Sequence, residues 1–403
     1  MEHSDQVLEK VALAAHLREG PAGVEAFLRQ VYRETALPLA DLARRLGWPV
    51  PVTAAVRGEL DRAGLTARVP GGVALSAVGR QLAGAVLGLA VLEDALCPTC
   101  AGRRVVVDLD RWARTLACLE EMHRANPTVD TTLDQSHGTP ETALRRALAM
   151  HHEGALEGRA VLILGDDDLV SVAIGLLALP PAAGGPGAGV RAGRLVVVDI
   201  DTRFLAHIAA AGERHGFTVE TVAHDVRAPL PEALRAAFDT VETDPPYTLP
   251  GLRLFLSRAR EALRPGVGHD LFLSYAARDP AGQCALLRQC VDLGLAPYSV
   301  TPDFNRYAGA GTLGGSSQLV HLRTTDAVAQ PAGPYDGPLY TMDERPARRT
   351  YRCLACAADH VVGPGGDFAT IEALVEQGCP RCGGRRFRSG KRTTGRRPTG
   401  TGG

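Results

Sequence analysis

The feature that most constrains the fold of this chain is an apolar segment that runs directly into a row of carboxylates. Residues 160–164 (AVLIL) are followed by Gly165 and then by three aspartates at 166–168. Two later segments, 195–201 (LVVVDID) and 238–248 (FDTVETDPPYT), also begin with apolar residues and continue into acids. In an open α/β sheet, ligands bind outside the carboxyl ends of the strands. Three strands that end in carboxylates therefore predict one acidic pocket, suited to a cationic ligand.

From residue 158 the sequence alternates between strand-like and helical patterns. Such alternation predicts parallel strands joined by helical crossovers, so we expect an α/β, Rossmann-like domain over 158–325. Strands are expected at 160–164, 195–200, 219–223, 238–243 and 270–276, with helices at 170–179, 203–215, 231–236, 252–263 and 284–293. Residues 298–305 and 317–323 are expected to close the sheet as an antiparallel pair, and 180–193 to form a surface loop.

Residues 1–92 carry helical patterns and one hairpin pattern. Helices are expected at 6–17, 37–46 and 52–63, and a hairpin at 64–75 (GLTARVPGGVAL). Helix, turn, helix and hairpin is the winged-helix order, which is typical of DNA contact. The alternative is a dimerisation or substrate-shaping domain on the same scaffold. The helix at 52–63 mixes acids with bases, which favours the alternative, because a helix laid against phosphates should be plainly basic.

Residues 93–157 form a connecting segment with one CxxC pair and further helical patterns. Cys97 and Cys100 make half of a zinc knuckle, and no second CxxC follows closely. Cys118 and His123 are candidate extra ligands, but both lie in a helical pattern. A metal site and a structural turn with free thiols therefore both stay open.

A capping pattern introduces the central domain. Thr139 is an expected N-cap for a helix at 143–150, with Pro140 at the first helical position. This structural role alone could account for both residues. It does not account for Gln135 or Glu141, which we therefore count among the candidate site residues.

A second cysteine pattern follows a Pro- and Ala-containing linker at 326–350. Two CxxC pairs within 351–388 predict a zinc ribbon, and its role should be structural because four thiolates leave no open coordination position. We expect the basic tail at 389–403 to be disordered, and either solvated or in contact with nucleic acid or another polyanion. The predicted zinc ligands are Cys353, Cys356, Cys379 and Cys382.

Composition limits the classes of protein that this chain can belong to. The net charge is -1, so any electrostatic field that matters must be local. The start, MEHSDQ, lacks the basic and apolar regions of a signal peptide, and the most apolar stretch, 82–92, is too short to span a bilayer. We therefore expect a cytosolic protein without membrane contact, whose nine cysteines are thiols or metal ligands rather than disulfides.

The acidic turn at 165–168 indicates which nucleotide-like ligand the pocket should take. In enzymes that use S-adenosylmethionine, the turn after the first strand lies near the amino-acid end of the cofactor. Three carboxylates would repel a cofactor carboxylate, whereas they would attract an ammonium by about 4 kcal/mol for two charges 4 Å apart at an effective dielectric constant near 20. The turn therefore favours decarboxylated S-adenosylmethionine, with Asp167 and Asp168 as candidate contacts. Metal binding and helix capping are alternatives, and capping suits Asp168 best.

Acids at the ends of the next strands fit the rest of such a donor. Asp199 ends the second strand, where an acid typically accepts hydrogen bonds from ribose hydroxyls, and Asp201 follows it. Asp225 ends the third strand, at the position that usually meets the adenine edge. Each of these signals is weak alone, and together, in strand order, they support one donor site.

The sharpest motif is Asp244-Pro245-Pro246-Tyr247. Two prolines fix the chain after the aspartate in an extended turn, which presents the carboxylate and the aromatic ring at the strand end. Such a pair can hold an amine and direct its lone pair at an electrophilic carbon. A mere strand-ending turn is the alternative.

These motifs resemble those of the branched-chain polyamine synthases, also called N4-bis(aminopropyl)spermidine synthases. The resemblance implies a methyltransferase-like sheet and transfer of aminopropyl groups from decarboxylated S-adenosylmethionine to the secondary amine of spermidine, with release of methylthioadenosine. The zinc ribbon and the basic tail depart from the pattern of the family. The motifs are DQ at 134–135, TPET at 139–142, LGDDDLVS at 164–171, VVVDID at 196–201 and TDPPYTLPG at 243–251, within a similar region of roughly 97–323.

The hypothesis is therefore an aminopropyltransferase in which Asp166 or Asp244 takes the amine proton. Tyr247 would pack against the polyamine, and Asp167 would hold the donor ammonium or a distal amine. A homodimer, and nucleic-acid contact through the winged helix and the tail, are further hypotheses. Two rival functions are an S-adenosylmethionine-dependent amino-group methyltransferase acting on nucleic acid, and a DNA-binding regulator that senses polyamines. The remaining donor-binding candidates are Gly165, Asp168, Asp199, Asp201, Asp225, Gln135, Glu141 and Pro245.

Overall fold

The computed structural model of the protein divides into two compact units. The first comprises Met1–Thr131 with Gln135–Asp336, and the second comprises Thr132–Asp134 with Gly337–Gly403. Among the helices that the structure describes, none is both long enough and apolar enough to cross a membrane. The described residues are 2–32, 34, 36–85, 103, 105–180, 188–308, 315–327, 333–341, 347–362, 366–368 and 371–394.

The N-terminal part of the first unit consists of helices and one hairpin. The predicted hairpin is confirmed, since Thr66 pairs with Leu75 across an antiparallel turn that contains Gly71 and Gly72, both at positive φ. The prediction omitted α2, although its buried residues follow helical spacing. Assignment as a winged helix stays a prediction. The elements are α1 (Glu2–Ala14), α2 (Gly20–Tyr32), α3 (Leu39–Leu46), α4 (Val50–Arg62), β1 (Thr66–Val69), β2 (Gly72–Leu75) and α5 (Ala77–Ala85).

The connecting segment contains α6 (Ala113–Arg124), the 3-10 turn η1 (Thr131–Leu133) and α7 (Pro140–His152). The Thr139 hydroxyl accepts a hydrogen bond from the Thr142 amide at 3.2 Å, which confirms the predicted cap of α7. Cys97 and Cys100 lie outside the described residues, so the question of a metal site at that pair is untouched.

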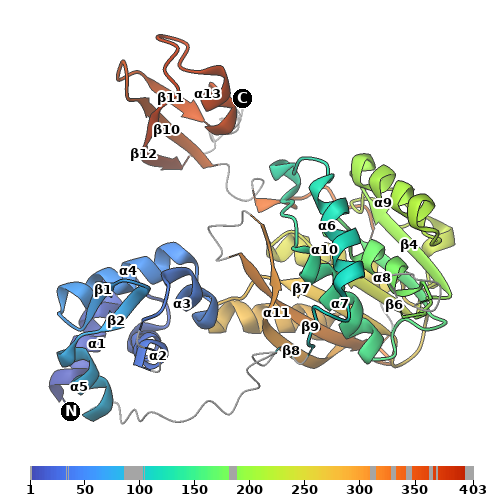
Figure 1. The fold of residues 1–403 in the computed structure, drawn as a ribbon, viewed down its shortest axis with the longest axis horizontal. Helices are drawn as coiled ribbons and strands as arrows, with labels where there is room; N and C mark the ends of the chain where they lie inside the picture. Colours follow the sequence, from blue (N-terminus) through green and yellow to red (C-terminus); the bar gives the residue numbers. More distant parts are fainter. Residues whose placement is uncertain are drawn as a thin grey trace, which may run out of the picture. The chain divides into compact units, whose positions relative to one another are not determined.

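A seven-stranded sheet forms the centre of the first unit (Figure 1). Its order is β5-β4-β3-β6-β7-β9-β8, in which β3 to β7 are parallel, β9 runs antiparallel to β7, and β8 runs antiparallel to β9. The predicted parallel sheet and its antiparallel closing pair are therefore confirmed. The strands are β3 (Ala160–Leu164), β4 (Arg194–Asp199), β5 (Glu220–Ala223), β6 (Thr240–Thr243), β7 (Asp270–Tyr275), β8 (Leu295–Arg306) and β9 (Ser316–Thr324).

The crossovers are α8 (Val170–Leu177), α9 (Thr202–His215), α10 (Leu249–Ala262) and α11 (Pro280–Asp292). The helix predicted at 231–236 is wrong, because only the 3-10 turn η3 (Glu232–Leu234) forms there and Ala236 has a positive φ of 50°. All five residues of β3 are buried. Successive side chains of a strand point to opposite faces, so helices must cover both faces of the sheet. Val161 and Ile163 share a core with residues of α7, α8 and α9.

The second unit contains a three-stranded antiparallel sheet in the order β11-β10-β12, together with α13 (Ile371–Gln377). The strands are β10 (Ala347–Cys353), β11 (Asp359–Val362) and β12 (Phe387–Thr394). Two predictions need correction. The linker expected to reach residue 350 ends before Ala347, and the tail expected to be disordered from 389 pairs with β10 as far as Thr394. Strand pairing overrides the low apolar content of β12, which alone suggested disorder.

Candidate active site

The ends of three neighbouring parallel strands bring the acidic motifs to one edge of the sheet. Leu164 of β3 lies beside Val198 of β4 on one side and beside Thr243 of β6 on the other. The turn at 165–168, Asp199 and Asp244 therefore leave the sheet side by side. Gly165 has a positive φ of 80°, which favours glycine, and its amide donates to the Val198 carbonyl at 2.9 Å. The predicted common site is thus formed by the strand register.

Asp166 faces the start of α8. One of its carboxylate oxygens accepts the Val170 amide at 2.6 Å, and the other accepts the Ser171 amide at 3.0 Å. The suggestion that Asp168 is the capping acid is therefore wrong, because the turn aims Asp166 at the orphan amides of the helix. Burial raises the pKa of Asp166 to about 7, although these hydrogen bonds oppose the rise.

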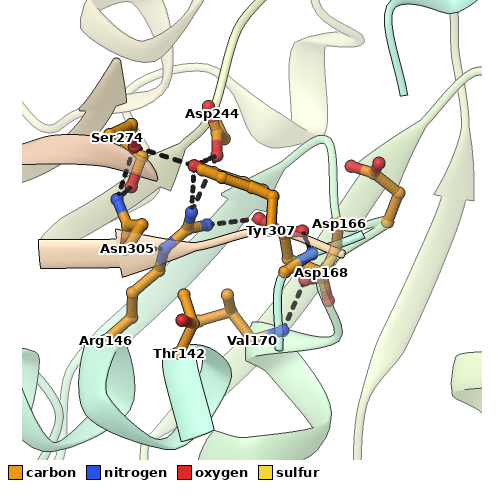
Figure 2. Close-up of polar contacts among 12 residues, drawn as sticks. Thr142, Arg146, Asp166, Asp168, Val170, Asp244, Ser274, Asn305 and Tyr307 are labelled. Carbon is orange, nitrogen blue, oxygen red and sulfur yellow. Dashed lines mark hydrogen bonds and ion pairs between the residues drawn. The ribbon is translucent and has the colours of Figure 1, made fainter. Parts of the chain in front are cut away.

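Asp168 instead pairs with a buried arginine on α7, Arg146 (Figure 2). The guanidinium of Arg146 lies 2.7 Å from an oxygen of Asp168, 2.7 Å from Asp244 and 3.3 Å from Glu242. The other Asp168 oxygen accepts the amide of Gly138, where an added Cβ would stand only 2.8 Å from that oxygen. A single side chain thus connects the acids that follow β3 with those of β6.

Asp244 uses its two carboxylate oxygens unequally. Oδ2 accepts hydrogen bonds from Arg146 at 2.7 Å and from the hydroxyl of Tyr307, on the chain just after β8, at 2.5 Å (Figure 2). Oδ1 is buried and has no hydrogen-bond partner among the described residues. Burial raises the pKa of Asp244 to about 6, against the opposing effect of Arg146. The carboxylate is therefore fixed in orientation and keeps one oxygen free to accept.

Asp167 lies among the other acids of this edge. Its carboxylate accepts the Ser136 amide at 3.1 Å. Burial, followed by the negative charges of Asp168, Asp199 and Asp244, raises the pKa of Asp167 well above its usual range. The turn that carries Asp167 lies between the ends of β4 and β6, beside Asp199 and Asp244, which supports the common acidic site that the sequence predicts.

Asp199 and Asp201 organise the end of β4. Asp199 accepts the amides of Asp166 at 3.0 Å and of Asp201 at 2.7 Å, so it joins the turns after β3 and β4. Asp201 caps α9 through the Arg203 amide and also accepts Gln135 Nε2 at 3.0 Å. The Arg203 side chain beside Asp201 lowers the pKa of that carboxyl to about 2. Gln135 therefore lies at the same edge as the acidic motifs.

Two other candidates lie in more open surroundings. Asp225 follows β5 and accepts the Arg227 amide at 2.9 Å, with 42% of its side chain exposed. Glu141 pairs with Arg145 one helical turn later, and 48% of its side chain is exposed. The contacts of Glu141 therefore place it on the surface of α7 rather than with Arg146.

The Asp244–Tyr247 turn is held from both sides. Pro245 is buried, and the Tyr247 hydroxyl donates to that of Tyr307 at 3.1 Å. The Tyr247 ring meets Tyr275 edge-on at 5.1 Å, and Arg278 donates to the Tyr247 carbonyl at 2.5 Å. The rigidity predicted from the two prolines is thus reinforced by β7 and the chain that follows it.

Four residues of this site are not among the candidates predicted from the sequence: Arg146, Glu242, Asn305 and Tyr307. Arg146 is only 1% exposed and lies between Thr142 and Met150 on the buried face of α7. Arginine is almost never fully buried unless paired, so an arginine in an apolar helical stripe is a detectable signal. Glu242, inside a buried strand, gives the same signal. Asn305 and Tyr307 lie near the end of β8 and carry no comparable pattern.

The four cysteines of the second unit form one cluster. Their sulfur atoms all lie within 4.8 Å of one another, an arrangement that can hold a metal ion. Cys353 and Cys382 are 3.6 Å apart at sulfur, as are Cys356 and Cys379. Backbone amides, first that of Ala355, lower the pKa of Cys353 to about 7, whereas, against a backbone hydrogen bond that lowers it, the neighbouring cysteines raise the pKa of Cys382 to about 12.

Comparison with known proteins extends over both units. An uncharacterized protein of Methanocaldococcus jannaschii is 33% identical over 387 residues, which cover 96% of this chain and 93% of that protein. The N(4)-bis(aminopropyl)spermidine synthase of Thermococcus kodakarensis is 35% identical over 220 residues, or 54% of this chain and 58% of the synthase.

A solved structure and a family model agree with this similarity. The branched-chain polyamine synthase of Thermus thermophilus, crystallised with N4-aminopropylspermidine and 5′-methylthioadenosine, superposes with a TM-score of 0.64 and 26% identity. That match covers 85% of this chain and 98% of the synthase. The family model for the C-terminal domain of branched-chain polyamine synthase A matches residues 115–317, about half of the chain, and this span includes every acid discussed above. The chain therefore belongs to the branched-chain polyamine synthase family.

Proposed function

We propose that this chain transfers aminopropyl groups from decarboxylated S-adenosylmethionine to an amine of spermidine or a related polyamine. The products are a branched-chain polyamine and methylthioadenosine. Relatives named N(4)-bis(aminopropyl)spermidine synthase support this activity. The observation that carries the proposal is the acidic cluster at the ends of β3, β4 and β6, which we define as Asp167, Asp168, Asp199, Glu242 and Asp244, around the buried Arg146.

The charge of the acidic cluster suits both substrates. Its carboxylates outnumber the buried cation Arg146, so a cationic ligand would relieve their mutual repulsion. The donor carries a sulfonium and an ammonium, and the acceptor is a polycation. Each close ammonium–carboxylate pair contributes about 4 kcal/mol of attraction at 4 Å and an effective dielectric constant near 20. A donor that kept its carboxylate would lose part of this attraction.

The reaction forms a bond between the acceptor nitrogen and the aminopropyl carbon next to sulfur, and it breaks the bond between that carbon and sulfur. The sulfur keeps the electron pair and leaves as the neutral thioether of methylthioadenosine. The acceptor nitrogen attacks with its lone pair, so it must give up a proton. The site therefore has to align the two substrates and accept one proton.

Asp244 suits the role of proton acceptor better than Asp166. Oδ1 of Asp244 is buried and free to accept, whereas both oxygens of Asp166 bind amides at the start of α8. A group with a pKa of about 6 is largely ionised at neutral pH and can still hold a proton during the reaction. We therefore assign the proton to Asp244 and an ordering role to Asp166.

The remaining contacts follow the order of the strands. Asp167 would hold the donor ammonium or a distal amine of the acceptor, and Tyr247 would pack against the polyamine chain. Asp199 would accept the ribose hydroxyls, and Asp225 would meet the adenine edge. Gly165, Asp168, Asp201, Gln135 and Pro245 would shape the donor site, while Glu141 stays a prediction.

Mass spectrometry of the products tests the proposed function. The protein is incubated with decarboxylated S-adenosylmethionine and a panel of linear polyamines, and in parallel with S-adenosylmethionine and either the same polyamines or nucleic acid. We expect the acceptor to gain aminopropyl groups only with the decarboxylated donor, together with stoichiometric methylthioadenosine. Methylated nucleic acid from S-adenosylmethionine would instead support the rival methyltransferase, and DNA binding that responds to spermidine without turnover would support the rival regulator.

We further propose that the four cysteines of the second unit bind a structural zinc ion. Zn–S bonds of about 2.3 Å in a tetrahedron place sulfur atoms about 3.8 Å apart. The two 3.6 Å sulfur pairs fit that spacing closely. The cluster would supply four thiolates and no open position, so the metal would stabilise the fold rather than take part in catalysis.

The N-terminal part and the assembly state remain proposals of the same kind. The order of α3, α4 and the β1–β2 hairpin supports a winged helix, used for dimerisation, substrate shaping or nucleic-acid contact. Light scattering would test for a homodimer, and filter binding would test for nucleic-acid contact.

A further inference from the structure

The buried arginine of α7 takes no direct part in the bond formation or the proton transfer of the proposed reaction. Arg146 belongs to none of the acidic motifs, yet it contacts members of two of them and is 1% exposed. We propose that Arg146 is the positioning residue of this site, which with Tyr307 occupies Oδ2 of Asp244 and leaves Oδ1 as the oxygen that meets the reacting amine. This inference rests on the proposed function.

Each nitrogen of the Arg146 guanidinium has at least one hydrogen-bond acceptor, and Nη1 also forms an ion pair with Asp168. Nε donates to Asn305 Oδ1 at 2.8 Å. Nη1 lies 2.7 Å from Asp168 and 3.3 Å from Glu242, and Nη2 donates to Asp244 at 2.7 Å and to the Tyr307 hydroxyl at 2.8 Å. A guanidinium has five N–H donors in a rigid planar fork, so this arrangement fixes both its position and its orientation.

The acceptors of Arg146 come from separate parts of the sheet. Asp168 follows β3, Glu242 and Asp244 belong to β6 and its end, and Asn305 and Tyr307 lie near the end of β8 (Figure 2). Asn305 is fully buried, and its amide nitrogen donates to Ser274 of β7 at 3.1 Å and to Ser317 of β9 at 2.8 Å. The orientation of the guanidinium is therefore set by five strands of the sheet rather than by α7 alone.

The consequence for Asp244 is a carboxylate with one occupied and one vacant oxygen. Tyr307 donates to Oδ2 and accepts from Arg146, so the three groups form a closed triangle on one side of the carboxylate. The Asp244 carboxylate accepts one hydrogen bond from Arg146 and one from Tyr307. It cannot turn without breaking both. Oδ1 therefore points in a fixed direction, as a base must if it is to meet an amine within hydrogen-bond reach.

Other charged and titratable groups act on Asp244, and the test must separate them from Arg146. They are Asp168 after β3, Asp167 in the same turn, Glu242 on β6, Tyr247 in the following turn and Tyr307 after β8. The carboxylates and the buried tyrosine hydroxyls favour protonation of one another, whereas Arg146 and the Tyr307 hydrogen bond favour the ionised form of Asp244. Loss of either of these two partners should therefore raise the pH at which Asp244 becomes active.

Three variants test the positioning role of the Arg146 guanidinium. Arg146→Lys keeps a positive charge but replaces five fixed donors with three mobile ones. Tyr307→Phe removes one hydroxyl and no charge. It is the milder variant, and it keeps the test valid if Arg146→Lys does not fold. Arg260→Lys is the matched control: Arg260 is a 6% exposed arginine of α10 that donates to the Ala327 carbonyl at 3.1 Å, outside the acidic cluster.

The test is the pH profile of kcat and of kcat/KM for the acceptor in the full chain. Its acid limb, the rise in rate with pH, reports the pH at which the base becomes ionised. We expect Arg146→Lys to lower kcat at least ~100-fold, the scale of a misplaced catalytic group, with a smaller change in KM. We expect Tyr307→Phe to move the acid limb upward by about one pH unit, the equivalent of one lost charge-assisted hydrogen bond. Arg260→Lys should leave the acid limb in place. Unchanged acid limbs and near-normal kcat in both site variants would overturn the inference.

A binding measurement keeps this inference separate from the proposed function. Calorimetric titration with spermidine between pH 5 and 8 needs no turnover and reports the pH at which the site gains affinity for a cation. A wild-type protein that binds spermidine and forms no aminopropylated product would refute the function. If the pH dependence of binding then moved in Tyr307→Phe and Arg146→Lys but not in Arg260→Lys, the positioning role would survive; identical curves in all variants would remove it.

Discussion

The acidic cluster of the first unit and the thiolate cluster of the second unit solve the same problem in opposite ways. Each gathers groups that repel one another when ionised. The acidic cluster contains its own cation, Arg146, whose donors reach Asp168, Glu242 and Asp244. The thiolate cluster has four sulfur atoms within 4.8 Å of one another, and its neighbour His360 contacts Cys379 at 3.1 Å.

The difference shows what each cluster requires from outside the chain. An internal cation lets the acidic cluster fold before a ligand arrives, while the surplus carboxylates keep their preference for cations. A thiolate cluster without a cation gains most of its stability from the metal itself. We therefore expect the acidic cluster to bind ligands that exchange, and the thiolate cluster to hold an ion permanently.

Removal of the proposed zinc ion should produce the largest effect, and this effect should be confined to the second unit. Structural zinc contributes about 10–16 kcal/mol of apparent binding energy in small zinc domains. We expect Cys379→Ser to abolish stoichiometric zinc and the hydrogen-exchange protection of β10, β11 and β12, while aminopropyl transfer changes only a few-fold. Metal analysis and amide exchange measure the two outcomes.

The control for that change is Cys284→Ser, which removes an exposed thiol of α11 outside the cluster. It should leave zinc content and exchange rates unchanged. A Cys379→Ser protein that retained one zinc per chain, or that lost transfer as completely as it lost exchange protection, would contradict the separation between the two clusters.

The same contrast explains how much of each cluster the sequence could reveal. All four cysteines of the thiolate cluster lie in two CxxC pairs within 30 positions. Pairs with this spacing are typical of zinc sites, so the sequence alone identifies the candidate ligands. The acids at 166–168, Asp199 and Asp244 were also visible, because parallel strands end at one edge. Tyr307 was not, because the antiparallel strand β8 brings it to Arg146 of α7 across 161 positions. Arg146 itself was detectable as an arginine in an apolar helical stripe, but which residues it contacts was not.

The predicted cap of α7 is confirmed, whereas the predicted cap of α8 is wrong. Thr139 before α7 was recognised, since a threonine followed by proline has few other uses. The turn at 165–168 offers three aspartates in a row, and only the positive φ of Gly165 and of Leu169 decides that Asp166 faces α8. Backbone conformation of that kind cannot be deduced from residue types.

Replacing single carboxylates should show which oxygens face the substrate. We expect Asp244→Asn to lower kcat at least ~10²-fold, on the scale of general-base catalysis, because the amide cannot take a proton at Oδ1. Asp166→Asn should lower kcat less than ~10-fold, because its carboxylate faces α8. Initial rates at saturating donor and acceptor measure both. Equal losses in the two variants would show that the amide contacts of Asp166 do not exclude it from the chemistry.

The same buried carboxylates should also give a dependence of stability on pH that runs opposite to the usual one for acids. Burial raises the pKa of Asp166 to about 7 and that of Asp244 to about 6, above their ordinary value of 3.8. The unfolded chain loses these protons first, so between pH 4 and 7 the folded state binds more protons and stability falls as pH rises. The loss is on the order of 1 kcal/mol for each pKa unit.

A polyamine should reverse that trend if the acidic cluster is its binding site. Cations favour the ionised carboxylates, so spermidine should raise the unfolding temperature more at pH 8 than at pH 5, and its binding near pH 6 should release protons. Calorimetry in buffers of different ionisation enthalpy measures the release. Sodium chloride at equal ionic strength is the control, because screening alone would stabilise the cluster without stoichiometric proton release. Proton uptake on binding would mean that the ligand meets groups other than these acids.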